Sequence, residues 1–159
     1  MDGPQNFRIG SGDLQIDGTS VGLTNEDGVI VTYEPDVHLH LSSKFGSTPV
    51  KASLVGIKLT LEVSMAEQTW ENILNAFAGV VDADGKIKFG GLAGTEIEGH
   101  ELSLIPADET PTWYFRNAVP TGPIETAFNA KDERIIKAVF TAMVDTEAED
   151  DDNLGYILS

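Results

Sequence analysis

The three histidines are the side chains of this chain best suited to metal chemistry. His38 and His40 are two residues apart in an alternating segment, so both imidazoles fall on one face of a predicted strand. A zinc site takes three or four protein ligands, which makes this pair only half of a site. The third histidine, His100, is distant in sequence, and nothing in the pattern brings it to the pair. The sequence favours an exposed polar strand face, and we expect no bound metal.

Carboxylates and hydroxyls offer two further patterns, and both are incomplete. Asp82-Ala-Asp84-Gly85 resembles the middle of a calcium-binding loop, but that frame puts Val80 and Gly91 at positions where carboxylates are required. We interpret the segment as a turn between a helix and a strand. Ser103 lies three residues from His100, on the opposite face of a strand, and no nucleophile elbow occurs. We therefore expect neither an enzyme nor a cofactor.

Charge narrows the class of partner. The 159 residues include 26 acidic and 10 basic ones, for a formal net charge of −16. Such a surface repels phosphate, which disfavours specific binding of nucleic acid. Six of the eight residues from Asp145 to Asp152 are acidic, and we interpret residues 146–159 as a solvated acidic C-terminal arm on a single domain at 1–145.

Membrane and export signals are not found in the sequence. No apolar run reaches the length that crosses a bilayer, and the chain does not begin with the pattern of a signal peptide. There is no cysteine, so disulfides are excluded. We expect a soluble protein without a membrane anchor, made in a cytoplasm.

Apolar and polar residues alternate with a period of two along most of the chain, which predicts strands. The predicted strands are Leu14–Asp17, Val29–Glu34, Val37–Leu41, Val55–Val63, Lys86–Phe89, His100–Ile105, Thr112–Ala118 and Arg134–Val144. Turns are predicted at Asp17-Gly18, Asp27-Gly28 and Asp84-Gly85, and a loop at Pro120 and Pro123. The last strand is apolar on both faces, so it is either central or covered by a neighbouring chain.

One segment has helical periodicity. Trp70, Ile73, Leu74 and Phe77 recur at three and four residues, which predicts an amphipathic helix over about 65–78. Ser64 and Glu67 have the spacing of a capping box, and Gly79 is suited to closing the helix. Together the elements predict a mainly β protein, an antiparallel β-sandwich or partly open barrel with one flanking α-helix.

A pattern of strands and turns carries a family resemblance. The segments Arg8–Gly18, Val21–Thr24, Val31–Pro35, Phe45–Gly56 and Phe89–Gly94 appear in an order similar to that of the tail tube (major tail) proteins of long-tailed bacteriophages. The later pieces His100-Glu-Leu102, Pro106-Ala-Asp108 and Ala118–Pro123 fit the same pattern. The likeness covers most of the chain and includes no active-site signature.

The resemblance implies a structural protein of the virion tail, assembled in the host cytoplasm. Six copies would form a ring, and stacked rings would form a tube that conducts DNA during ejection without binding it specifically. The implied partners are further copies of the chain and the tape-measure, tail-tip and tail-terminator proteins. A long loop between two strands would reach the next ring. That loop would be Ser42, Ser43, Lys44, Phe45, Gly46, Ser47, Thr48 and Pro49, with Phe45 as its apolar anchor and Lys44 as its charged contact.

The polar faces of the strands on either side of that loop are candidates for the wall of the bore. A carboxylate-rich bore keeps phosphates centred by repulsion. The lumen-facing candidates are Glu34, Asp36, His38, His40, Lys58, Thr60 and Glu62. Alternation predicts that the residues of each strand share a face, but it leaves open which sheet faces inward.

Strand edges favour assembly as well. We expect the strand at 135–144 to be an unprotected edge that pairs between subunits. A Val139→Pro substitution should then block assembly as well as harm the fold, since it removes a ladder donor.

Two other function classes remain open at this stage. A ring protein of a phage-derived secretion or injection machine would share the architecture, but its bore would suit protein cargo. A monomeric β-domain that binds a small ligand or carbohydrate would need a concave aromatic cluster. Trp113, Tyr114 and Phe115 form the only dense aromatic run, and core packing is the simpler reading of them.

Overall fold

The computed structural model describes residues 13–22, 24–66, 69–106, 111–124, 126 and 136–159. Within them one helix, α1 (Trp70–Ala76), interrupts a series of strands. The strands are β1 (Asp13–Ile16), β2 (Thr19–Ser20), β3 (Thr24–Leu41), β4 (Pro49–Met65), β5 (Val81–Ala83), β6 (Lys86–Lys88), β7 (His100–Ile105), β8 (Thr112–Pro120), β9 (Ile136–Ala142) and β10 (Gly155–Leu158). All strand pairs are antiparallel. The predicted mainly β, antiparallel fold with one helix is confirmed.

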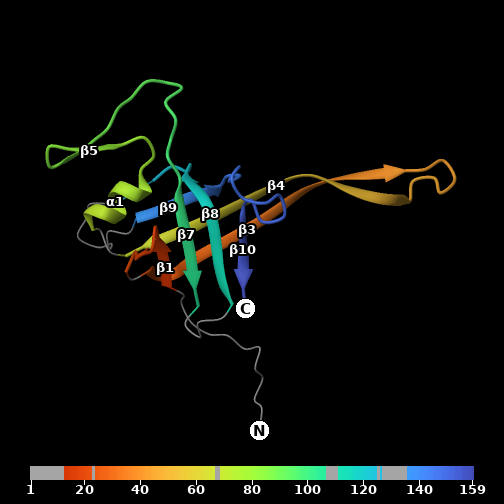
Figure 1. The fold of residues 1–159 in the computed structure, drawn as a ribbon, viewed down its shortest axis with the longest axis horizontal. Helices are drawn as coiled ribbons and strands as arrows, with labels where there is room; N and C mark the ends of the chain where they lie inside the picture. The colour runs from red at the N-terminus through yellow and green to blue at the C-terminus, as the bar shows by residue number, and fades with distance from the viewer. Residues whose placement is uncertain (1–12, 23, 67–68, 107–110, 125, 127–135) are drawn as a thin grey trace, which may run out of the picture.

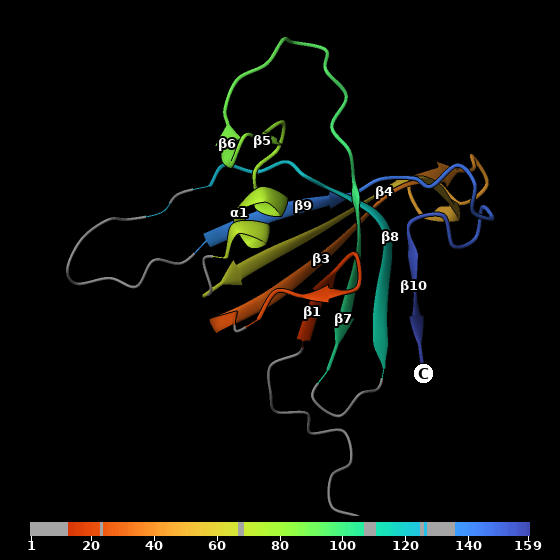
Figure 2. The ribbon, with the colours of Figure 1, turned by 60° about the vertical axis from the view of Figure 1, so that its left-hand side comes forward.

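Most strands belong to one sheet, in the order β2-β1-β7-β8-β9-β4-β3, and β5 and β6 form a separate hairpin. The sheet branches at β8 because its first residues, Thr112–Phe115, pair with β10, whereas Ala118–Pro120 pair with β9. Figure 2 shows how the sheet curls, so that β3 and β4 cross behind β1 and β7. The described strands do not close into a barrel.

The core fills the inside of this curl and consists of alternate residues of the paired strands. Leu61 of β4 opposes Phe140 of β9, and both side chains are fully buried. The predicted alternation in β4 is therefore confirmed over Leu59–Val63. Other members of the same cluster are Leu14, Ile16, Met65, Leu102, Phe115, Ala118, Ile136 and Ala138. One continuous core of this kind holds the curled sheet together.

The strand predicted as an open edge is not an edge. β9 pairs with β4 on one side, where Glu62 opposes Val139, and with β8 on the other. The carbonyl oxygen of Val139 also accepts a backbone hydrogen bond from Thr121 at 2.9 Å. One face of β9, with Ile136, Ala138, Phe140 and Ala142, is buried, whereas the other face carries the exposed Lys137 and the half-buried Val139 and Thr141. The prediction that this strand pairs between subunits is therefore wrong, and Val139→Pro, which was also expected to harm the fold, cannot test subunit pairing.

The helix is shorter than predicted. Ser64 and Met65 still belong to β4, so Ser64 does not cap the helix, and its proposed partner Glu67 lies outside the described residues. Thr69 is the N-cap instead, with its Oγ1 accepting a hydrogen bond from the Asn72 backbone nitrogen at 3.1 Å. At the other end Phe77 is extended, and Gly79 lies in the turn that follows.

The buried side of α1 also differs from the predicted apolar face. Asn72 and Ala76 are its buried residues, whereas Trp70 is 48% exposed. The Asn72 side chain donates a hydrogen bond to the carbonyl oxygen of Val21 at 2.7 Å. Ile73 and Phe77 pack against the edge of the core as predicted. Figure 2 shows α1 lying beside β9.

Two of the three predicted Asp-Gly turns are present. Asp17 and Gly18 join β1 to β2, Asp84 and Gly85 join β5 to β6, and all four residues have positive φ angles. The third pair, Asp27-Gly28, lies within β3, at an irregularity in its pairing with β4. Pro120 likewise ends β8 instead of lying in a loop.

Candidate functional site: a projecting hairpin and the hollow at its base

β3 and β4 form a hairpin that extends far beyond the rest of the sheet (Figure 1). They contain 18 and 17 residues, but β9 pairs with β4 only from Thr60 to Met65. Residues 37–55, the projecting hairpin, therefore form a two-stranded ribbon to which no third strand of the described residues is added. The predicted strands Val29–Glu34 and Val37–Leu41 are two parts of the single strand β3.

A bulge in β4 sets which residues share a face of this ribbon. Asp36 opposes Gly56, but Val37 opposes Leu54, so Val55 is left without a partner in β3. Because of the extra residue, the apolar face of β4 carries odd-numbered residues in the body and even-numbered residues in the projecting hairpin. The sequence of β4 indicates this bulge, since its apolar residues occupy even positions up to Leu54 and odd positions from Val55 onward. Alternation along the predicted strand Val55–Val63 would put Val55 on the apolar face with Ile57 and Leu59, but at the bulge its side chain is 66% exposed.

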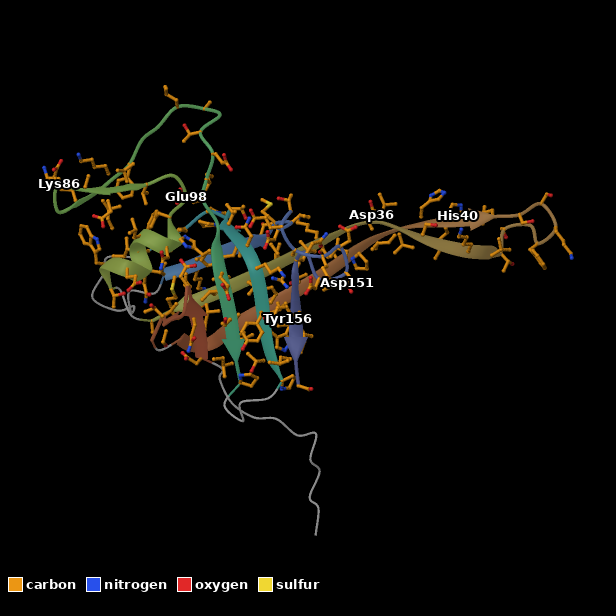
Figure 3. The ribbon with its side chains drawn as sticks, in the orientation of Figure 1. Asp36, His40, Lys86, Glu98, Asp151 and Tyr156 are labelled. Carbon is orange, nitrogen blue, oxygen red and sulfur yellow. The ribbon has the colours of Figure 1, made fainter. Side chains whose placement is uncertain are left out.

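The register places all seven lumen candidates on one face of the hairpin, the polar face. Glu34 opposes Lys58, and Thr60 and Glu62 continue the row toward the body. The bulge adds two residues that the sequence analysis missed, because Ser53 and Lys51 oppose His38 and His40. In Figure 3 the labelled Asp36 and His40 lie along the hairpin. Among the seven candidates only His40 and Thr60 are partly covered.

The two histidines of the polar face contact each other. Their ring centroids are 4.6 Å apart in an edge-to-face arrangement, and Nε2 of His40 is 2.8 Å from Oγ of Ser53. His100 is engaged elsewhere, with its Nδ1 2.8 Å from Asp17 Oδ2. No group of three or more histidine, aspartate or glutamate residues in the described part of the chain is arranged to hold a metal ion. The structure therefore does not assemble a three-histidine site.

The opposite face of the projecting hairpin is apolar and open to solvent. Val37, Leu39 and Leu41 of β3 are 45%, 53% and 63% exposed, and Leu54 of β4 is 60% exposed. The same face in the body of the protein carries the buried Leu59 and Leu61. The apolar stripe therefore runs from the core out along the hairpin, and no other described element covers its outer half.

The tip of the hairpin has a defined turn structure. The backbone nitrogen of Phe45 donates to Ser42 O at 3.0 Å, and that of Thr48 donates to Phe45 O at 3.3 Å. Gly46 has a φ of 65°, a value that glycine adopts without strain. The Lys44 Nζ lies 5.4 Å from the centre of the Phe45 ring. Pro49 was predicted to belong to this loop, but it begins β4 and pairs with Leu41, so the loop is residues 42–48.

The acidic C-terminal segment folds back onto the sheet. The exposed side chains of Glu147, Glu149, Asp150 and Asp151 agree with the predicted solvated charge. Beyond them, however, Gly155–Leu158 form β10 on β8, and Tyr156 stacks on Tyr114 with ring centroids 4.9 Å apart. Residues 155–158 are thus an additional strand, which the sequence analysis did not predict.

Arg116 holds this returning segment to β8. Its Nη2 donates to Asp152 Oδ2 at 2.7 Å and its Nε donates to the backbone oxygen of Asp152 at 2.9 Å. The hydrogen bond that the guanidinium donates to the carboxylate of Asp152 raises the pKa of Arg116 above its usual value. The guanidinium also lies 5.3 Å from the Tyr156 ring centre.

A hollow of about 380 Å³ lies where the hairpin leaves the body. Its apolar wall includes Tyr33, Ile57 and Leu59 from the hairpin base, and Trp113 and Tyr114 from β8. Phe115 and the C-terminal residues 150–157 form the remaining wall. Trp113 was interpreted as a core residue, and it does contact the core, but it also lines this hollow.

The segment with calcium-loop spacing forms a β-hairpin. Asp82 is in β5, Asp84 is in the turn and forms an ion pair with Lys88 at 3.1 Å, and Trp70 Nε1 donates to Asp82 at 3.3 Å. The interpretation as a helix-to-strand turn is wrong, since the turn joins two strands.

No protein-family model matches the chain, and no curated protein matches it. No helix in the described part of the chain is long and apolar enough to cross a membrane.

Proposed function

We propose that this chain is a structural protein that assembles with copies of itself into stacked rings, forming a tube through which DNA passes. The resemblance to tail tube proteins suggests six copies in each ring and a place in the tail of a virion. The observation that carries the proposal is the projecting hairpin, whose outer apolar face is uncovered in the single chain.

The energetics of the hairpin favour a partner. An isolated two-stranded ribbon is marginally stable in water, and this one exposes Val37, Leu39, Leu41 and Leu54 on one face. Since full burial of such a side chain contributes about 1.5–3 kcal/mol, covering these half-exposed ones would contribute about 1 kcal/mol each. Exposed apolar patches of this kind mark interaction sites.

The open edge of the sheet supports self-assembly in the same way. β3 is the last strand in the sheet order, so along its 18 residues only the side toward β4 has a partner among the described strands. An unpaired edge of this length is a template for pairing with another chain. A ring would remove it by joining the β3 edge of one copy to a neighbour.

The polar face is the surface we assign to the bore. Glu34, Asp36 and Glu62 lie on it and are exposed, and a chain with a net charge of −16 repels phosphate overall. The basic Lys51 and Lys58 on the same face are spaced between polar groups and do not form a continuous basic stripe. Such a surface would line a channel without retaining DNA.

Electron microscopy of the purified protein over a wide concentration range tests the proposal. We expect rings or hollow tubes of constant diameter, and the subunit count would give the symmetry. Because assembly can require an initiator, the protein is also seeded with preformed tail tips. Protein that remains monomeric at the highest concentration and after seeding would contradict the proposal.

The hollow at the hairpin base supports the second candidate, a monomeric domain that binds a small ligand. Its volume of about 380 Å³ and its aromatic wall are typical of small-molecule sites. A monomer whose Trp113 fluorescence changes on addition of an apolar compound would favour this candidate. A phage-derived injection machine would be distinguished by protein cargo in the tube and by the lack of capsid genes nearby.

A further inference from the structure

The projecting hairpin is the basic end of an acidic molecule. Residues 37–61 contain no aspartate or glutamate, although the chain has 26 of them. The same 25 residues include Lys44 and Lys51 of the projecting hairpin and Lys58 at its base, three of the ten basic residues. Charge is therefore separated between the hairpin and the rest of the chain, which gives two copies a preferred mutual orientation.

The tip of the hairpin combines this charge with an aromatic ring. Phe45 is 54% exposed, and the Lys44 ammonium lies 5.4 Å from its ring centre. The turn hydrogen bonds of Ser42 and Thr48 hold the tip in shape, so little ordering is needed on binding. The tip offers an aromatic anchor with an adjacent cation.

The hollow at the base of the hairpin is complementary to this tip in shape and charge. Its wall includes Trp113, Tyr114 and Leu59, and its lining also includes the exposed carboxylates of Asp150 and Asp151. No ion pair involving either of these two carboxylates is present among the described residues, whereas Asp152 is held by Arg116. A cavity of roughly 150 Å³ is enough to hold a benzene ring, so this hollow of about 380 Å³ has room for a phenylalanine side chain.

We infer that Phe45 of one copy inserts into the hollow of a second copy, with Lys44 paired to Asp150 or Asp151 there. The inference rests on the proposed self-assembly and adds the receiving site. The contact must be between copies, because the tip is at the far end of the hairpin whereas Asp151 and Tyr156 lie near its base (Figure 3). Tip and hollow are different surfaces of the same chain, so the contact is head-to-tail and repeats from copy to copy, as between successive rings.

Cysteine cross-linking tests the contact directly, because the natural chain contains no cysteine. Full-length Ser43→Cys and Glu149→Cys chains are mixed under oxidising conditions; both positions are exposed and leave Lys44, Phe45, Asp150 and Asp151 intact. We expect a disulfide-linked heterodimer. The matched control is Ser43→Cys mixed with Lys86→Cys, an exposed position at the start of β6, which should give no product above background.

Charge exchange provides the second test. We expect Lys44→Glu and Phe45→Ala each to weaken association by roughly tenfold or more, as measured by sedimentation. A chain carrying both Asp150→Lys and Asp151→Lys should be weakened as well, and it should associate again when mixed with Lys44→Glu chains. Ser47→Ala at the same tip is the control and should leave association unchanged.

The outcomes separate this inference from the proposed function. Tubes that form without the Ser43–Glu149 cross-link, and that are insensitive to Lys44→Glu, would overturn the docking site but leave the tube function standing. A specific cross-link with charge rescue but without tubes would support the docking site and contradict the tube. Protein that stays monomeric and gives no cross-link overturns both.

Discussion

At the scale of single residues, the C-terminal strand depends on one glycine and one arginine. Gly155 begins β10, and a Cβ atom built on it would lie 2.1 Å from the backbone oxygen of Tyr114. No flexible side chain can move to relieve that contact, since the obstacle is backbone. Arg116 then holds the preceding turn through Asp152. The wall of the hollow is thus held by two local contacts.

We predict that Gly155→Ala releases β10 from β8. The clash should reduce the free energy of unfolding by about 1–3 kcal/mol and expose the backbone of Tyr156 and Ile157. Denaturation by urea measures the first effect, and hydrogen exchange of these amides measures the second. The control is Gly56→Ala, whose Cβ would meet nothing within 4 Å. Unchanged protection of the β10 amides would show that the close approach does not exist.

At the scale of elements, the helix depends on its first turn because it has only seven residues. Thr69→Ala removes the oxygen that accepts from the Asn72 nitrogen, so we expect a loss of about 1 kcal/mol in the free energy of unfolding. Thr69→Ser keeps that oxygen and should be close to neutral. Equal stability of the alanine and serine variants in urea denaturation would argue against the cap.

The β3–β4 hairpin is a single element with a buried half and an exposed half. We expect Leu61→Ala, in the buried half, to cost about 2–5 kcal/mol of stability. Leu39→Lys, on the same face but 53% exposed, should change monomer stability by no more than about 0.5 kcal/mol and yet prevent assembly. Urea denaturation and electron microscopy distinguish the two effects. Normal tubes from Leu39→Lys would mean that this face is not an interface.

At the scale of the whole molecule, charge determines the response to DNA. We predict that assembled wild-type protein does not retain duplex DNA at physiological salt. A variant with Glu34→Lys, Asp36→Lys and Glu62→Lys should still assemble, because these side chains are exposed, but its tubes should retain DNA in a salt-dependent manner. Filter binding at several salt concentrations measures this. If the triple variant assembles and does not bind DNA, the polar face does not line the bore.

Alternation by itself was sufficient to predict the fold class and most of the strands. His100–Ile105 has the predicted bounds, and β1, β6, β8 and β9 differ from their predicted bounds by a few residues. The Asp-Gly turns at 17–18 and 84–85 were predictable because both residues need positive φ angles. These features were predictable because they depend on neighbours in the sequence.

The features that sequence reasoning missed depend on distant partners. Ser64 had the spacing of a cap, but its strand pairs with β9, and the helix begins at Trp70 after a threonine cap. The C-terminal acids indicated a solvated arm, whereas Arg116 and the free edge of β8 bring the chain back as β10. The residues of the last strand left open whether it is central or covered by a neighbouring chain, and only its pairing with β4 and β8 decides between the two.

The sequence by itself determined the alternating strands, the acidic balance and the acid-free stretch at 37–61, since each of these is a property of residue order and composition. Only the tertiary structure decided that residues 37–55 of this stretch project as a two-faced hairpin, and that the C-terminal segment forms part of the wall of the hollow at its base. The physical reason is that strand pairing and register depend on which segments come together in space. Local alternation fixes the face of a residue within its own strand, but not the strand that lies opposite.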